Sequence, residues 1–203
     1  MLTTRPEKKA AAKLEGKLSS ALHALRYRNF KLFLAGQLVS LIGNYIQTVA
    51  QAWLVYRLTG SAAALGLVAF SGQISIFILA PISGVVADSK SRKHILFATQ
   101  IAPMLLCLTL AVLTLSGRVQ VWHVFTIAAL LGVVNAFDFP VRQAFVAELV
   151  TREDLMSAVT LNSSMINSAR TIGPGIGGLL VASIGEGWCF LANAISFAAV
   201  IVG

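Results

Sequence analysis

The sequence predicts an all-α integral membrane protein, a bundle of six transmembrane helices. Hydrophobic residues make up 57% of the chain and charged residues only 12%, about half the charge of a typical soluble domain. The mean hydropathy is +0.79. The apolar residues fall in long uncharged runs, and each run is long enough to cross a bilayer core of roughly 30 Å as a helix of about 20 residues.

Residues 1–27 form a polar, basic tail that precedes the predicted bundle of residues 28–203. No apolar stretch comes before Phe30, so a cleavable signal peptide is not expected. Two interpretations of the tail stay open, a short amphipathic helix on the membrane surface and a solvated segment.

Six apolar runs follow, and each is interpreted as one membrane-spanning helix. Very short segments separate several of them, at residues 57–61, 116–120 and 185–187. Short connections favour antiparallel packing of consecutive helices. The six runs are 30–56, 62–86, 95–115, 121–139 with an extension toward 148, 157–184, and 188–203.

The orientation follows from lysine and arginine, which are enriched in cytoplasmic loops. With the N-terminus in the cytoplasm, the outer side holds only Arg57 and Arg118. This distribution also explains the net charge of +8 without nucleic acid, and no nucleic-acid-binding module is present. We expect a multi-pass protein of the bacterial plasma (inner) membrane with a cytoplasmic N-terminus. The inner side would hold Arg5, Lys8, Lys9, Lys13, Lys17, Arg26, Arg28, Lys31, Lys90, Arg92, Lys93, Arg142 and Arg152.

Polar residues recur every three or four positions along the first run, which places them on one helix face. Polar side chains are costly against lipid, so this face must meet protein or water. Hydrogen bonding between helices is one interpretation, and the wall of an aqueous cavity is the other. The length of the stripe favours the cavity. Its members are Gln37, Ser40, Asn44, Gln47, Thr48 and Gln51.

The fifth run carries a second polar face, formed by Thr160, Ser164, Asn167 and Thr171. Arg170 lies well inside this run, and a charge at that depth is costly and functional by default. We therefore expect Asn167 and Arg170 to face the substrate cavity, although a structural pair of Arg170 with carbonyl groups or a carboxylate is the alternative.

A glycine-rich segment follows in the same run, at Gly173, Pro174, Gly177 and Gly178. Glycine lets a neighbouring helix approach closely, and proline removes a backbone hydrogen bond. This segment is predicted to be a flexible packing site.

Two pairs of opposite charges are spaced four residues apart, Asp88 with Arg92 and Asp138 with Arg142. Both pairs are expected at the cytoplasmic ends of helices. Exposed pairs contribute only about 0–1 kcal/mol each, so we interpret them as a latch that holds one conformation. A solvated loop with topogenic charge is the alternative. No buried carboxylate that could carry a proton is evident.

Enzymatic motifs are missing: the sequence has no HExxH, no P-loop and no serine nucleophile elbow. The three histidines are scattered, and neither a metal site nor a cofactor is expected. Cys107 and Cys189 are predicted to be free thiols, because they fall at different membrane depths.

Several motifs together resemble the major facilitator superfamily over about residues 25–203. Its loop signature is similar to Gly84-x-x-x-Asp88 followed by Arg92-Lys93, and its antiporter motif to Gly173-Pro174-x-x-Gly177-Gly178. The segments 53–61 and 138–143 (Asp-x-Pro-x-Arg-Gln) look like the branch that includes the enterobactin exporter and macrolide efflux proteins. Departures from the motifs are Ser89, Ser91 and Ala169.

The resemblance implies the N-terminal half of a twelve-helix fold, with the C-terminal six-helix half as its partner. It implies secondary active transport, a proton-coupled efflux of a drug or siderophore by alternating access. Asn44, Gln47, Gln51, Asn167 and Arg170 would line the cavity, and the glycines of the fifth helix would pack against the missing half. The latch would comprise Gly84, Asp88, Arg92, Lys93, Asp138 and Arg142.

One alternative is a non-transporting orphan half or fragment that acts as a membrane partner subunit. Import by symport is a third possibility, which the antiporter motif disfavours.

Overall fold

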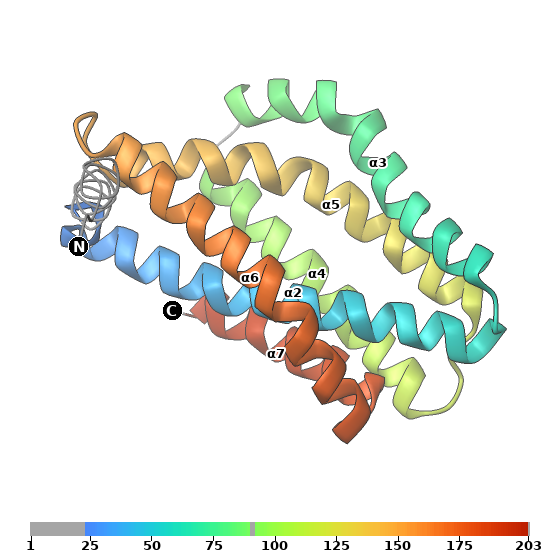
Figure 1. Ribbon diagram of the computed structural model, residues 1–203. Helices are drawn as coiled ribbons and strands as arrows, with labels where there is room; N and C mark the ends of the chain where they lie inside the picture. Colours follow the sequence, from blue (N-terminus) through green and yellow to red (C-terminus); the bar gives the residue numbers. More distant parts are fainter. Residues whose placement is uncertain (1–22, 90–91, 203) are drawn as a thin grey trace, which may run out of the picture.

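The computed structural model describes residues 23–89 and 92–202, without the side chains of residues 87–93 and 202. Most of the predicted basic tail therefore lies outside the described residues. A short 3-10 helix, η1 (Ala24–Arg26), leads into six α-helices, and no strand occurs in these ranges (Figure 1). The helices are α2 (Arg28–Thr59), α3 (Ala62–Ser89), α4 (Arg92–Leu115), α5 (Val121–Glu148), α6 (Leu155–Ile184) and α7 (Glu186–Val202).

Four of the described helices are long and apolar enough to cross a membrane. They are α2, the Ala62–Val86 part of α3, the His94–Leu115 part of α4, and α5. Helix α6 has 30 residues but carries several polar side chains, and the described part of α7 has 17 residues. The protein is thus an all-helical membrane protein, and the six-span count stays a prediction.

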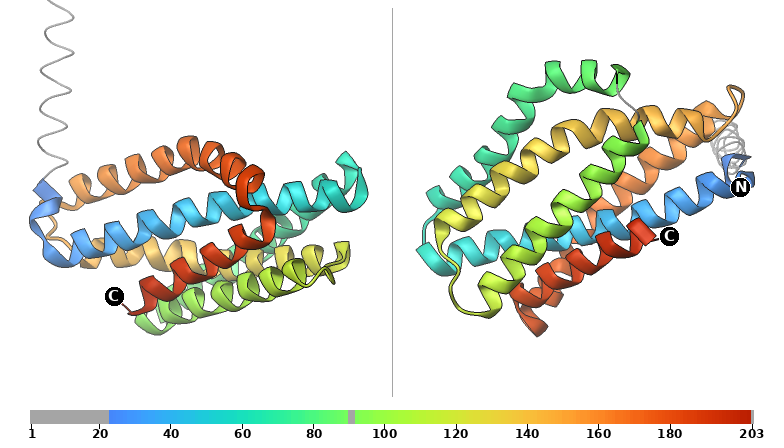
Figure 2. Two further views of the ribbon diagram at one scale, coloured as in Figure 1. Left: turned by 90° about the horizontal axis from the view of Figure 1, so that it is seen from below. Right: turned by 180° about the vertical axis from the view of Figure 1, so that it is seen from behind.

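The helices do not pack chiefly with their neighbours in the sequence, and in this respect the expectation from short connections is wrong. Helix α3 packs mainly against α5, α4 against α7, and α2 against both α6 and α7. Figure 2 shows α7 alongside α4 and α2. A short connection fixes only where the next helix begins, whereas small and polar side chains decide which faces meet.

Glycine ends two of the helices by adopting a left-handed or otherwise positive φ. Gly60 follows α2 with φ 63°, and its N–H donates to the Tyr56 carbonyl. Gly185 separates α6 from α7 with φ 82°. Residues other than glycine rarely adopt these φ angles, so both chain reversals depend on glycine at positions 60 and 185.

Helix α3 bends away from the bundle in its second half (Figure 1). Pro81 lies inside this helix. Proline lacks the N–H that would bond to the carbonyl four residues earlier, and its ring clashes with that carbonyl. The bend has an identifiable cause in the sequence.

Two apolar clusters hold the bundle at its two ends. The larger contains Leu54, Val55, Leu110, Val124 and Phe190, from four different helices. The smaller joins Ala24 and Phe30 to Val146 and Ala158 near the start of the described chain. The middle of the bundle, between these clusters, is where polar side chains gather.

Candidate functional site

A cavity of about 450 Å³ opens in the middle of the bundle, within the size range of small-molecule sites. Its walls come mainly from α2, α3 and α5, with Thr99 and Pro103 of α4 and Phe197 of α7. The apolar part of the wall includes Val68, Ile76 and Leu131. The polar part consists of Asn44, Gln47, Thr48, Gln51, Gln73, Thr99, Asn135, Asp138 and Arg142.

The polar stripe of α2 supplies one side of this cavity. Asn44, Gln47 and Gln51 lie on its wall, as the sequence predicts. Nearer the start of the helix, Gln37 and Ser40 are buried and do not line this cavity. Gln37 lines a separate apolar groove. One helical face therefore serves both a cavity and helix packing.

A pair of glycines brings the walls of α3 and α5 together. A Cβ atom on Gly132 would lie 2.2 Å from the carbonyl oxygen of Gly72. No side chain fits at that distance, so the crossing of the two helices requires glycine at position 132. Sequence reasoning missed this pair, because two isolated glycines on different helices carry no signal that they meet.

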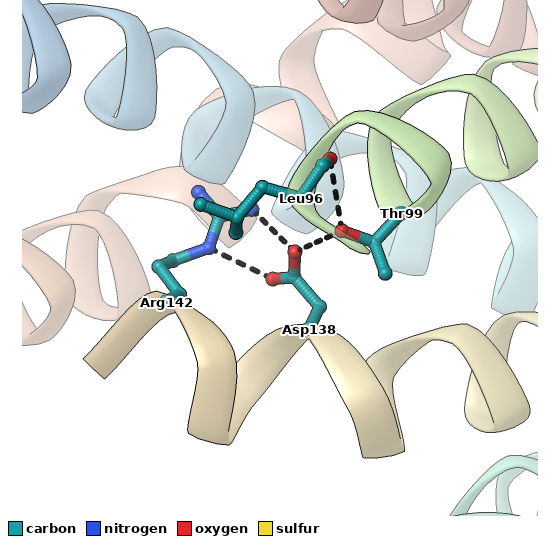
Figure 3. Close-up of polar contacts among 4 residues, drawn as sticks. All are labelled: Leu96, Thr99, Asp138 and Arg142. Carbon is teal, nitrogen blue, oxygen red and sulfur yellow. Dashed lines mark hydrogen bonds and ion pairs between the residues drawn. The ribbon is translucent and has the colours of Figure 1, made fainter. Parts of the chain in front are cut away.

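Asp138 and Arg142 form a bidentate ion pair on α5 beside the cavity (Figure 3). Arg142 Nε lies 2.8 Å from Asp138 Oδ2, and Nη2 lies 2.9 Å from Oδ1. The Thr99 hydroxyl of α4 lies 2.7 Å from Asp138 Oδ1 and 3.1 Å from the Leu96 carbonyl oxygen. Both charged side chains are 17% exposed, and charge-assisted bidentate pairs are among the stronger polar contacts.

The expected place of this pair at a helix end is wrong. Helix α5 continues past Asp138, through Pro140, to Glu148. Asp138 therefore lies inside the helix and on the cavity wall, and the predicted extension of this helix toward 148 agrees with its end at Glu148.

The rest of the predicted latch lies largely outside the described side chains. Asp88 belongs to the last turn of α3, and Arg92 and Lys93 to the first turn of α4, but their side chains are not described. Gly84 lies within α3, and a Cβ there would meet nothing within 4 Å. Contacts between these residues and Asp138 stay a prediction.

The glycine segment of α6 packs within the described bundle, so the expectation that it packs against a missing half is wrong for Gly173 and Gly177. A Cβ on Gly173 would lie 2.5 Å from Tyr45 Cβ, and one on Gly177 would lie 3.1 Å from Ile46 Cα. Both glycines let α6 cross α2 closely. Gly178 is exposed with open space around it, and Pro174 is also exposed.

Asn167 and Arg170 lie on the exposed face of α6 and do not line the cavity. The Asn167 amide donates to the Ser163 carbonyl of its own helix, at 2.9 Å. The structure thus brings Asn44, Gln47 and Gln51 together with Asp138 and Arg142, and it places the two α6 residues elsewhere.

A buried polar cluster behind the cavity was also missed. Asn193 of α7 and Cys107 of α4 both contact the Gln47 side-chain oxygen.

Cys107 and Cys189 are free thiols, as predicted. At the far end of the bundle, Arg57 Nε donates to Glu186 at 2.6 Å. Among the described residues, no three His, Cys, Asp or Glu side chains group closely enough to hold a metal ion.

Comparison with known proteins identifies the family. The family model of transmembrane secretion effectors, within the major facilitator superfamily, matches residues 19–203. The chain belongs to this family of the major facilitator superfamily. Its members are transporters and not enzymes.

Curated relatives of this major facilitator chain are transporters and efflux pumps. The chain is 30% identical to the staphyloferrin A transporter of Staphylococcus aureus, over 82% of this chain and 42% of the relative. It is 30% identical to the multidrug efflux pump Tap of Mycolicibacterium fortuitum, over 76% and 39%. It is 26% identical to macrolide efflux protein A of Streptococcus pyogenes, over the same shares.

This major facilitator chain therefore spans about two fifths of the length of these relatives. No solved structure matches it.

Proposed function

We propose that this protein takes part in proton-coupled export of a small molecule, such as a drug or a siderophore, by alternating access. One observation carries the proposal: the central cavity holds a carboxylate clasped by an arginine. Among the residues that line the cavity, Asp138 is the only acid. A family of transporters and relatives named for efflux support the direction of transport.

The ion pair gives the cavity a group that can bind a proton. Protonation of Asp138 would remove its negative charge and weaken both contacts to Arg142. The guanidinium cannot lose its own proton in proteins, so it would be left with free donors beside the cavity. A substrate group that donates to the ionised Asp138 carboxylate and a proton would compete for the same oxygens, which is the requirement for exchange.

The latch belongs to the same proposal. Asp88, Arg92 and Lys93 would engage Asp138 and Arg142 on the cytoplasmic side when the cavity faces outward. The N-terminus would be cytoplasmic in a bacterial plasma membrane, as the distribution of positive charge favours.

Transport into inside-out membrane vesicles tests the proposal. Vesicles with an imposed pH gradient would be assayed with a panel of macrolides and siderophores. Uptake should rise with the gradient, and Asp138→Asn should transport without responding to it. A gradient response that survives in Asp138→Asn would contradict the assignment of the proton site.

The second candidate is a partner subunit that does not itself transport. The exposed polar face of α6 favours a neighbour of some kind, since Asn167, Arg170 and Thr171 would be costly against lipid. In both candidates this face meets a second six-helix half or water. A cysteine at position 171 would be cross-linked to co-purified membrane proteins, and the same preparation would be assayed for transport. Cross-linking together with transport would favour the transporter, and cross-linking without transport would favour the partner subunit.

A further inference from the structure

Asn193 of α7 contacts two cavity residues from behind. Its Nδ2 donates to Gln47 Oε1, and it lies 3.3 Å from Asn44 Oδ1. Asn193 is 1% exposed and Gln47 is 5% exposed. Asn44 and Gln47 both line the cavity from α2, and residues three apart on a helix are neighbours on its surface.

The Gln47 oxygen has a second donor. The Cys107 thiol of α4 also contacts Gln47 Oε1. An amide oxygen has two lone pairs, so Asn193 and Cys107 together occupy it. The Gln47 Nε2 group has no hydrogen-bond partner among the residues described, and the same holds for Asn44 Nδ2. With both oxygens turned toward α7, the two amide NH2 groups are left for the cavity.

Turning the amides over would be unfavourable. The Gln47 NH2 group would then face the Cys107 sulfur, which accepts hydrogen bonds only weakly. The thiol would also lose the oxygen to which it now donates. A buried donor without a partner costs more than an ordinary hydrogen bond contributes.

The Asn193 amide is closely surrounded. The Ser196 hydroxyl lies 3.0 Å from Asn193 Oδ1 and 2.7 Å from the Asn193 carbonyl oxygen. A Cβ on Gly43 would lie 2.2 Å from the same oxygen. Glycine at position 43 therefore leaves the space that Asn193 occupies against α2.

We propose that Asn193 and Cys107 are positioning residues that turn the NH2 groups of Asn44 and Gln47 into the cavity. The wall they create offers two neighbouring donors, and it selects substrates that present acceptor oxygens there, such as ketone, ester or ether groups. A primary amine at the same place would meet donors instead of acceptors. This inference rests on the proposed function, because it takes the cavity to be the substrate site.

Hydrogen exchange of the side-chain amides tests the orientation without any substrate. The protein, labelled with ¹⁵N at asparagine and glutamine, would be placed in lipid nanodiscs and transferred to D₂O. Asn44→Ala, Gln47→Ala and Asn193→Leu would assign the three signals by NMR. The NH2 groups of Asn44 and Gln47 should exchange quickly with cavity water, and that of Asn193 should be protected. Protected NH2 groups at both α2 positions would overturn the proposal.

Variants at position 107 separate positioning from packing. Cys107→Ser keeps a donor of similar size and should leave the Gln47 exchange rate unchanged. Cys107→Ala removes the donor, so Gln47 should sample both orientations and its exchange should slow. Asn193→Leu should have the larger effect, because it releases both amides. Equal exchange in Cys107→Ser and Cys107→Ala, with no effect of Asn193→Leu on either α2 amide, would contradict the proposed role.

A matched pair of macrolides tests the selectivity. Erythromycin carries a ketone at a ring position where erythromycylamine carries a primary amine. Binding to the protein in membrane vesicles should favour the ketone by about tenfold, the ratio expected for one hydrogen bond, and Asn193→Leu should reduce this preference. Tighter binding of the amine would overturn the proposal. If neither macrolide binds while the Asn44 and Gln47 amides exchange quickly, the proposed export of such substrates is contradicted. The proposed orientation of the two amides is then still supported.

Discussion

Gly132 of α5 lies directly beneath the carbonyl oxygen of Gly72 on α3, at a place where a Cβ would approach that oxygen to 2.2 Å. The atom in the way belongs to the backbone, so no change of rotamer can relieve the contact. The two helices both line the cavity, and they can approach this closely because position 132 carries no methyl group.

Gly132→Ala should destabilise the protein. The helices must separate, which costs about 1–3 kcal/mol when a packed site is overfilled. Gly66→Ala on α3 is the matched control, since a Cβ there meets nothing within 4 Å, and alanine favours the helix. Thermal unfolding in detergent should show a lower midpoint for Gly132→Ala only. Equal midpoints would contradict the close crossing.

Gly173→Ala should separate α6 from α2, because a Cβ would reach 2.5 Å from Tyr45 Cβ. Gly178→Ala, in the same motif, faces open space and should leave stability unchanged or slightly raised. Thermal unfolding would be measured on the 203-residue chain alone. A lower midpoint for Gly173→Ala would then report contact of Gly173 with α2 and not with another half. If both substitutions were neutral in that chain, contact of Gly173 with α2 would be refuted.

Asp138 and Arg142 should show strong energetic coupling. Either single change, Asp138→Asn or Arg142→Gln, leaves the other charge half-buried without its partner, whereas the double change leaves neutral groups. A double-mutant cycle on the free energy of unfolding should give a coupling on the order of 1–3 kcal/mol. Arg142→Lys should recover only part of it, since lysine lacks the planar fork of arginine. Strict additivity would show that the pair is not formed in the membrane.

Cysteine labelling should place the two ends of the bundle on opposite sides of the membrane. Ser116→Cys, in the connection after α4, should react with an impermeant maleimide in intact cells. Glu153→Cys, before α6, should react only after lysis, as positive charge predicts a cytoplasmic location. Cys107 and Cys189 are buried and should stay silent. Reaction of both introduced thiols in intact cells would refute the orientation.

Arg170→Ala should abolish export while leaving expression and thermal stability intact. Arg170 is exposed on α6 in the described bundle, so its removal leaves no buried group there without a partner. Arg170→Lys keeps the charge but loses the bidentate geometry. Because Arg170 does not line the cavity, this change should impair export without changing substrate affinity. Lower stability with unchanged substrate affinity would assign Arg170 to the scaffold.

Local features of the fold could be read from the sequence, because they depend on residues close together in the chain. The apolar runs gave the helices, and the three-to-four-residue spacing of Asn44, Gln47 and Gln51 gave the polar face that lines the cavity. The predicted extension of the fourth run toward 148 agrees with the end of α5 at Glu148, since a helix can continue through polar residues when its neighbours cover it.

Pairing of distant residues could not be read in this way. Asn193 meets Gln47 across 146 positions, and each residue alone has an ordinary environment in the sequence. Gly72 and Gly132 likewise acquire their meaning only when α3 and α5 cross. The sequence predicted that Gly173 and Gly177 belong to a packing segment, but which helix they contact depends on the arrangement of the whole bundle.

The order of contacts has a consequence for how the protein is made. Helix α2 is synthesised before its main partners, α6 and α7. Its polar face would therefore wait in the membrane, without those partners, until α6 and α7 have been synthesised. Long-range pairing of this kind slows folding. During biosynthesis, the polar face of α2 would need shielding by the insertion machinery until α6 and α7 insert beside it.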